Sequence, residues 1–212
     1  MVTIMSFLTL ILLVHHFVIR PWMLAWGSPP QIQKLHLAGD DLSGGSVYTR
    51  AVLVHAPPEK IWVWIMQIGQ DRGGFYSYAW AENIFFADME NVYEIRNELQ
   101  VPRMPGDTVW MASKDRYKGE GHQIIAQIVT NNSFIMVSGE SYNKVKRGKK
   151  ATGSWSFYLY PENSESTWLI ARSCGGDQSR AERLLRYVFY EIPHFIMEQK
   201  MLRTIKRLAE EN

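Results

Sequence analysis

The sequence predicts an α+β fold, in which an antiparallel sheet is covered by one long C-terminal helix. A strand pattern at residues 46–54 precedes two helical patterns, and further strand patterns extend from residue 108 to residue 173. From about Ala181 to the end, apolar residues recur at helical spacing. A sheet with one apolar face must bury that face, and the last helix is its natural cover.

Length and composition indicate one domain with an appendage. The chain has 212 residues, of which 46% are hydrophobic, and eight of them are Trp, which is enough for a sizeable core. The net charge is only +2, so no global field attracts nucleic acid. A single cysteine, Cys174, excludes an internal disulfide and a cysteine-built metal site.

The N-terminal segment, residues 1–26, is predicted to be an apolar anchor helix. Met1 to Ile19 contains no Asp, Glu, Lys or Arg, and nineteen helical residues reach about 28 Å, enough for a bilayer core. Arg20, Trp22 and Trp26 follow as an interfacial cation and aromatic belt would. The segment therefore predicts a single-pass membrane protein.

Two alternatives stay open for this segment. A cleavable signal peptide is disfavoured by the missing basic start and cleavage motif. A buried or peripheral helix is the other reading, because His15 and His16 weaken the span. The first basic residues, Arg20 and Lys34, come after the span, so the positive-inside rule places the domain in the cytoplasm.

Residues 27–45 are rich in Pro, Gly and Ser and predict a linker, which leaves 46–212 as the domain. Ser46 to Val54 alternates as a strand does. Pro57-Pro58-Glu59 then opens a helix whose isoleucines recur at helical spacing.

The stretch from Gln67 to Asn83 combines glycine, aromatic and charged residues. Asp71-Arg72-Gly73-Gly74 indicates a tight turn, because glycine supplies backbone angles that a side chain forbids. The rings that follow, Tyr76 and Tyr78 among them, form either the rim of a pocket or an aromatic corner of the core. A short second helix is expected from Tyr78 to Phe86.

The second half of the chain predicts an antiparallel meander and a closing helix. The expected strands are Thr108–Ala112, His122–Val129, Ser133–Ser138, Thr152–Tyr160 and Thr167–Ser173. The last helix carries an apolar stripe of Ile192, Phe195, Ile196, Leu202, Ile205 and Leu208, and Pro193 is expected to restart or kink it.

One run carries most of a family resemblance: Ala56-Pro57-Pro58-Glu59, Trp62, Trp64, Gln67 to Tyr78, Trp80 and Glu82-Asn83. Shorter stretches extend it: Arg20-Pro21-Trp22 with Trp26-Gly27, Gly39-Asp40-Asp41-Leu42, and Pro193-His194-Phe195 with Met197-Glu198 and Lys200-Met201-Leu202. Over nearly its whole length the chain resembles a bacterial branch of the START-like superfamily, also called the SRPBCC or polyketide cyclase/dehydrase and lipid-transport group. The resemblance implies the helix-grip fold, in which a curved sheet grips the C-terminal helix and leaves a cavity between them.

The candidate site consists of polar groups on apolar faces together with nearby rings. His122 shares its strand face with isoleucines, Arg172 lies on a face with Trp168 and Ile170, and Gln199 interrupts the helical stripe. With the two tyrosines and the apolar walls, the predicted ligand-binding set is Tyr76, Tyr78, Trp110, His122, Trp155, Arg172, Phe195, Gln199 and Leu202.

Each polar member of that set has a structural alternative. The alternative for His122 is a hydrogen-bonded histidine in the core. The alternative for Arg172 is a residue near a strand end whose charged group reaches water, and for Gln199 it is a partly exposed helix position. Glu82 and Glu198 are candidate buried carboxylates that are expected at the surface. The scattered histidines, with no HExxH motif and no carboxylate-rich loop, predict no metal and no cofactor.

A basic cluster, Lys144 to Lys150, is expected at a hairpin tip, where Lys146, Arg147, Lys149 and Lys150 could meet anionic lipid headgroups. No wider basic face accompanies it, so nucleic acid is not an expected partner. The sequence thus predicts a membrane-anchored domain that binds an apolar or aromatic small molecule or lipid. The alternatives are a cyclase or dehydratase that uses His122 or a tyrosine, and a protein-interaction domain without a cavity.

Overall fold

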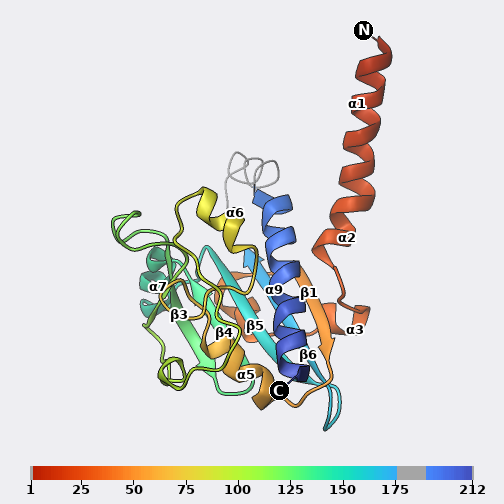
Figure 1. Cartoon of the computed structure of the whole chain (residues 1–212). Helices are drawn as coiled ribbons and strands as arrows, with labels where there is room; N and C mark the ends of the chain where they lie inside the picture. The colour runs from red at the N-terminus through yellow and green to blue at the C-terminus, as the bar shows by residue number, and fades with distance from the viewer. Residues whose placement is uncertain (1, 176–189, 212) are drawn as a thin grey trace.

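A six-stranded antiparallel sheet is the centre of the structure, a computed structural model that describes residues 2–175 and 190–211 (Figure 1). The strands follow one another in the order β1-β6-β5-β4-β3-β2. Their bounds are β1 Ser46–Val54, β2 Thr108–Trp110, β3 His122–Val129, β4 Ser133–Val137, β5 Gly153–Pro161 and β6 Thr167–Gly175. The predicted meander is confirmed, and the first strand pairs with the last.

One face of the sheet is covered by α9 (Glu191–Glu211), which lies across β1 and β6 and contacts α5 (Pro58–Met66). Ile61, Ile65 and Ile68 pack with Leu202 and Ile205 in the main core. The predicted α+β class and the helix-grip arrangement are therefore confirmed. The part of the expected last helix before residue 190 lies outside the described residues, and Pro193 lies in the first turn of α9.

Residues 27–45 do not form the expected linker. They contain two short helices, α3 (Pro30–Gln33) and α4 (Ala38–Ser43), and α4 packs on β5 and β6. Their apolar side chains form a second core with the other face of the sheet, around Ile32, Ala51, Ile135, Tyr158 and Ile170. Isolated apolar residues among Pro, Gly and Ser are enough to bury this segment, because the sheet already offers an apolar face.

The N-terminal helix projects from one end of the domain (Figure 1). It consists of α1 (Val2–Val14), a wider turn at His15–Ile19 and α2 (Arg20–Leu24). From Met5 to Leu24 it is long and apolar enough to cross a bilayer, although a signal sequence passes the same test.

α2 is bound to the domain. Arg20 donates two hydrogen bonds to Glu191 of α9, at 2.7 and 2.9 Å. The rings of Trp22 and Trp26 both meet Phe195 edge-on. Gly27 then brings the backbone against β1 at a φ of +68°, where an added Cβ would lie 2.1 Å from the Ala51 carbonyl oxygen.

The remaining helices are short. α6 (Ala79–Ile84) and a 3-10 turn at Asn97–Leu99 follow the central loop. α7 (Gly139–Lys146) occupies the connection between β4 and β5, where the sequence suggested a hairpin tip. Ser138 caps α7 by accepting a hydrogen bond from the backbone N–H of Ser141. The basic residues 146–150 therefore lie at the end of a helix and remain exposed.

Candidate functional site

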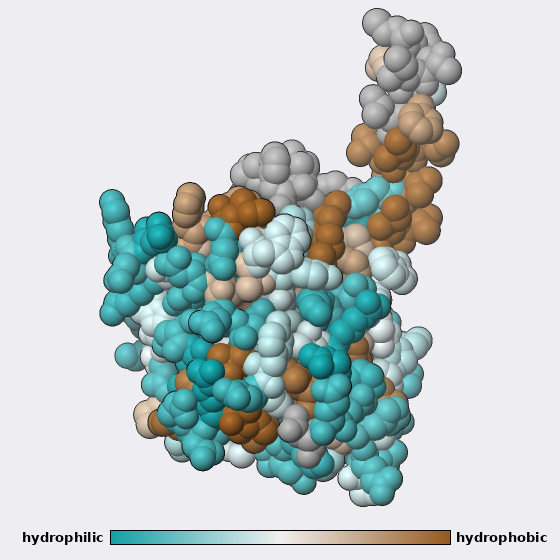
Figure 2. Space-filling model, in the orientation of Figure 1, coloured by the Kyte–Doolittle hydropathy of each residue, from teal (hydrophilic) through white to brown (hydrophobic). Residues whose placement is uncertain are grey.

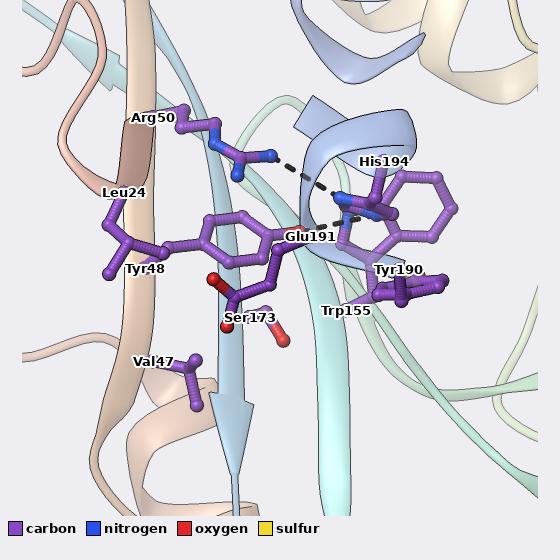
Figure 3. Close-up of a pocket in the computed structure, with 9 residues that line it drawn as sticks. All are labelled: Leu24, Val47, Tyr48, Arg50, Trp155, Ser173, Tyr190, Glu191 and His194. Atoms are coloured by element: carbon purple, nitrogen blue, oxygen red, sulfur yellow. Dashed lines mark hydrogen bonds between the residues drawn. The ribbon is translucent and has the colours of Figure 1, made fainter. Parts of the chain in front are cut away.

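Two neighbouring cavities lie between the sheet and the first turns of α9. The first has a volume of about 460 Å³ and is lined by Leu24, Val47, Tyr48, Arg50, Trp155, Ser173, Tyr190, Glu191 and His194 (Figure 3). The second has a volume of about 330 Å³ and is lined by Phe75, Ser77, Ala81, Glu82, Phe85, Met111, Trp155, Tyr190, Pro193, His194, Met197, Glu198 and Met201. Trp155, Tyr190 and His194 border both. We call them the polar cavity and the apolar cavity.

A buried carboxylate lies where the two cavities meet. Glu198 of α9 accepts a hydrogen bond from Arg50 Nη1 at 2.8 Å, and the side chains of both residues are 1% exposed. Its other oxygen accepts from the Tyr48 hydroxyl at 2.9 Å and from Trp155 Nε1 at 2.6 Å. Both oxygens of this carboxylate have hydrogen-bond partners, so its role is to connect β1, β5 and α9, and it has no free oxygen for a ligand.

Arg50 extends the same network toward the N-terminal helix. Its Nε donates to the Met23 carbonyl oxygen at 2.8 Å, and its Nη1 lies 3.3 Å from Nδ1 of His194 (Figure 3). The guanidinium also lies 4.1 Å from the centre of the Tyr48 ring. Burial, and next the Glu198 charge, raise the pKa of Tyr48 well above its ordinary value. The Tyr48 hydroxyl therefore stays protonated and acts as a donor.

The apolar cavity contains one incompletely satisfied carboxyl group. Glu82 Oε1 accepts a hydrogen bond from Ser77 Oγ at 2.6 Å. Glu82 Oε2 is buried and has no hydrogen-bond partner among the described residues. Burial raises the pKa of Glu82 above its ordinary value. The surrounding wall consists mostly of aromatic rings and thioethers.

The central loop is a corner of the core. Tyr76 is fully buried, and its hydroxyl donates to the Trp64 carbonyl oxygen at 3.2 Å and accepts from Gln67 Nε2. Burial raises its pKa to about 12. Gly74 has a φ of +75°, and an added Cβ would lie 2.4 Å from the Glu90 carbonyl oxygen. Of the aromatic residues in this loop, Phe75 reaches the apolar cavity and Tyr76 does not.

Arg172 lies on the opposite face of the sheet from both cavities. Its Nη1 donates to Asp40 Oδ2 at 2.8 Å and to the Leu35 carbonyl oxygen at 2.7 Å. Its Nε donates to Thr49 Oγ1 at 3.0 Å. Arg172 therefore lines neither cavity. Arg172 instead holds the segment of α3 and α4 against the sheet.

His122 and Trp110 pair with each other on β3 and β2, away from both cavities. Their rings meet edge-on at 5.2 Å, and His122 Nδ1 lies 2.9 Å from the Gly119 carbonyl oxygen. Tyr78 is 37% exposed just before α6, with Lys200 Nζ 5.8 Å from the centre of its ring. None of these side chains lines either cavity.

The α9 members of the predicted set lie near the cavities without lining them. Phe195 is buried against α2, and Leu202 is buried in the main core. Gln199 is partly exposed. Trp155 is the member that borders both cavities, and its ring packs on Phe75 at 5.9 Å.

Sequence reasoning missed the charged residues of the site. Glu198 was expected at the surface, yet it follows Phe195 by three residues and precedes Leu202 by four, so it lies on the apolar stripe of α9. Arg50 likewise shares its strand face with Tyr48. Opposite charges on two apolar faces were the signal that these faces meet.

Potential metal ligands and the single cysteine were the remaining groups with reactive chemistry. Among the described residues, no three His, Cys, Asp or Glu side chains are grouped so that they could hold a metal ion. Cys174 is buried with its Sγ 3.0 Å from Asp40 Oδ1. Burial, and next Asp40, raise its pKa to about 12, so the reactive thiolate is suppressed.

Comparison with solved structures finds similar folds at low sequence identity. CalC, a self-sacrificing resistance protein from Micromonospora echinospora, is 9% identical at a TM-score of 0.43, over 78% of this chain and 94% of CalC. Protein NE0264 from Nitrosomonas europaea is 12% identical at a TM-score of 0.42, over 77% of this chain and 94% of that one. No family model and no curated protein matches the chain. Such distant similarities carry no inference about function.

Proposed function

We propose that this protein is a membrane-anchored START-like domain that binds an apolar or aromatic small molecule, or a lipid, in the apolar cavity. The observation that carries the proposal is a cavity of about 330 Å³ between the sheet, α6 and α9, lined mostly by rings and thioethers. That volume is within the range of small-molecule sites. Burying a guest there contributes about 25 cal/mol for each Å² of apolar surface removed from water.

The lining is suited to guests of several shapes. Met111, Met197 and Met201 contribute flexible, polarizable side chains, and Phe75 and Trp155 form a stacked aromatic wall. Methionine adapts to irregular surfaces at little cost, whereas the aromatic wall is rigid. One side of the cavity can therefore adjust to a guest while the other orients it.

The membrane part of the proposal rests on where apolar side chains are exposed. α1 projects from the end of the domain that also carries α6 and the start of α9 (Figure 1). On α6 and just after it, Trp80, Ile84, Phe85 and Phe86 are each at least 62% exposed. Figure 2 shows apolar side chains gathered at this end, beside the projecting helix. Such a patch is typical of a membrane contact and would hold the cavity close to the bilayer.

The orientation follows from the few basic residues that flank the span. Arg20 lies at the junction of span and domain, paired with Glu191, and Lys34 follows it in sequence. The positive-inside rule then favours a cytoplasmic domain.

The binding function is favoured over the two alternatives. A cyclase or dehydratase needs His122 or a tyrosine within hydrogen-bond reach of the guest. His122 lines neither cavity, and the tyrosine among the described lining residues of the apolar cavity is Tyr190, which is 52% exposed. A pure interaction domain has no use for a cavity beside its C-terminal helix. The exposed patch on α6 borders this cavity through Phe85, so a membrane contact explains the patch as well.

The experiment is native mass spectrometry of the full-length protein, purified from its own host in mild detergent. We expect a bound small molecule, and we expect Met197→Trp, which fills the cavity, to lose it. Met104→Trp is the matched control, since Met104 is 63% exposed and lines neither cavity. Retention of the same ligand by Met197→Trp would contradict the cavity assignment, and recovery of the wild type in the soluble fraction without detergent would contradict the anchor.

A further inference from the structure

We propose that the apolar cavity selects a lipophilic amine, with Glu82 as the counter-ion of its ammonium group. This rests on the proposed function, because it names the class of guest for the same cavity. The inference starts from the carboxyl oxygen of Glu82 that is buried without a partner.

The unsatisfied oxygen needs a donor. Ser77 satisfies only Oε1, and a buried carboxylate with an empty oxygen is costly in an apolar surrounding. An ammonium group carries three donors and a full positive charge, so it can satisfy the free oxygen of Glu82 and neutralise the carboxylate at once.

The charges on the cavity wall have one sign. Two carboxylates, Glu82 and Glu198, line the cavity, and no Lys or Arg is present among its described lining residues. Glu198 is already paired with Arg50. His194 and Tyr190 are the other titratable groups among the described lining residues, and Lys200 of the same helix has its Nζ 5.8 Å from the centre of the Tyr78 ring. Among the residues that the structure describes, the wall therefore offers no Lys or Arg to a carboxylate or phosphate, and it offers the free oxygen of Glu82 to a cation.

Aromatic rings surround the same space. Phe75, Phe85, Trp155 and Tyr190 line the cavity with Glu82. The face of an aromatic ring attracts a cation. Ring faces that meet the guest favour a cation over an anion, so they add to the discrimination by Glu82.

The test uses three probes that share one apolar body: 1-aminoadamantane, 1-hydroxyadamantane and adamantane-1-carboxylate. Their binding to the full-length protein in mild detergent is measured by isothermal titration calorimetry. We expect the amine to bind about tenfold more tightly than the alcohol, the value of one charge-assisted hydrogen bond, and the carboxylate to bind most weakly.

The variant Glu82→Gln should lower the affinity for the amine about tenfold and leave the alcohol within about twofold. Glu120→Gln, at an exposed position that lines neither cavity, should change neither affinity. Equal binding of amine and alcohol to the wild type would overturn the role of Glu82 even if the variant failed to fold. If no probe binds at all, the failure lies with the cavity and thus with the proposed function.

Discussion

The two faces of the sheet each bury an arginine, and the two arginines have different partners. Arg50 of β1 and Arg172 of β6 are both 1% exposed, and the register places them side by side, since Thr49 pairs with Arg172 and Arg50 with Ala171. Arg50 pairs with a helical carboxylate on the α9 face. Arg172 divides its donors among backbone carbonyls, Thr49 and Asp40 on the other face. Each arginine thus combines one ion pair with backbone carbonyls, and the number of carbonyls differs: Arg50 donates to that of Met23, whereas Arg172 donates to those of Ile32, Gln33 and Leu35.

The two arginines also hold the N-terminal segment, residues 20–45, against the sheet. Arg50 reaches the Met23 carbonyl oxygen of α2, and Arg172 reaches the carbonyl oxygens of Ile32 and Leu35. Residues 20–45 are thus pinned to both faces of the sheet, so this segment is part of the fold.

The largest effect should follow from Arg50→Met. It leaves Glu198 buried without its positive partner, which costs about 3–5 kcal/mol of unfolding free energy. Denaturant unfolding followed by tryptophan fluorescence measures the loss, and Arg116→Met, in an ion pair whose side chains are 56% and 51% exposed, is the control with a change below about 0.5 kcal/mol. The double variant Arg50→Met, Glu198→Leu should recover part of the stability, and a double variant as unstable as the single one would contradict the ion-pair explanation.

Arg172→Met should lower the free energy of unfolding by about 2–4 kcal/mol, because several carbonyls and Asp40 lose a donor together. The segment that holds these carbonyls should open before the rest of the domain. Hydrogen exchange should accelerate at the backbone amides of α3 and α4 before it does in the core strands. In Arg50→Met the hydrogen-exchange rates of all helices and strands should instead increase together. Uniform acceleration in Arg172→Met would remove the distinction between the two faces.

Truncation tests the same segment as a whole. A chain that begins at Arg20 retains the Met23 carbonyl and the tryptophans that pack on Phe195. A chain that begins at Gln31 loses them and should be less stable by about 2–3 kcal/mol. Circular dichroism melting of the two chains measures the difference, and equal melting temperatures would show that residues 20–30 lie outside the fold.

A pH titration compares acidic groups on the two faces. Burial raises the pKa of Glu82, so the folded protein favours its neutral form, and the stability this gives is lost as pH rises from about 4.3, the ordinary value for Glu, through the raised pKa. Glu82→Gln cannot ionise and should gain stability relative to wild type across that window. On the other face, burial raises the pKa of Cys174 to about 12, so this thiol does not ionise in that pH window. The stability of Cys174→Ala should therefore change with pH as that of the wild type does. If the stability of Glu82→Gln changed with pH in the same way as that of the wild type, the burial of this carboxyl group would be contradicted.

The smallest effect on stability is expected for the basic cluster. Changing Lys146, Arg147, Lys149 and Lys150 to Ser should leave the melting temperature nearly unchanged, because all four side chains are exposed. It should weaken binding to anionic vesicles by about 1 kcal/mol per residue near the surface. Equal binding of wild type to neutral and anionic vesicles would rule out a headgroup contact at this cluster.

The strands and the last helix could be predicted from the sequence, because alternation and helical spacing follow directly from local geometry. The sequence could not show which face of each strand packs against which other element. β6 is buried on both faces, so its pattern has no polar side and does not show which face Arg172 occupies relative to the cavities. The burial of Tyr76 depends on the path of a loop and on Trp64, and neither leaves a periodic signal.

The attachment of α2 has a consequence for how the protein would work at a bilayer. A flexible tether lets a domain sample a hemisphere of positions, and its reach is set by the length of the tether. Here α2, at the domain end of the apolar helix, binds β1 and α9, with the Arg20–Glu191 pair at the joint. If the helix spans a bilayer as proposed, this joint would fix the height and tilt of the domain relative to the lipid, so part of its orientational entropy would be lost before any encounter. Guests and partners would reach the cavity by lateral diffusion toward a single fixed side of the molecule.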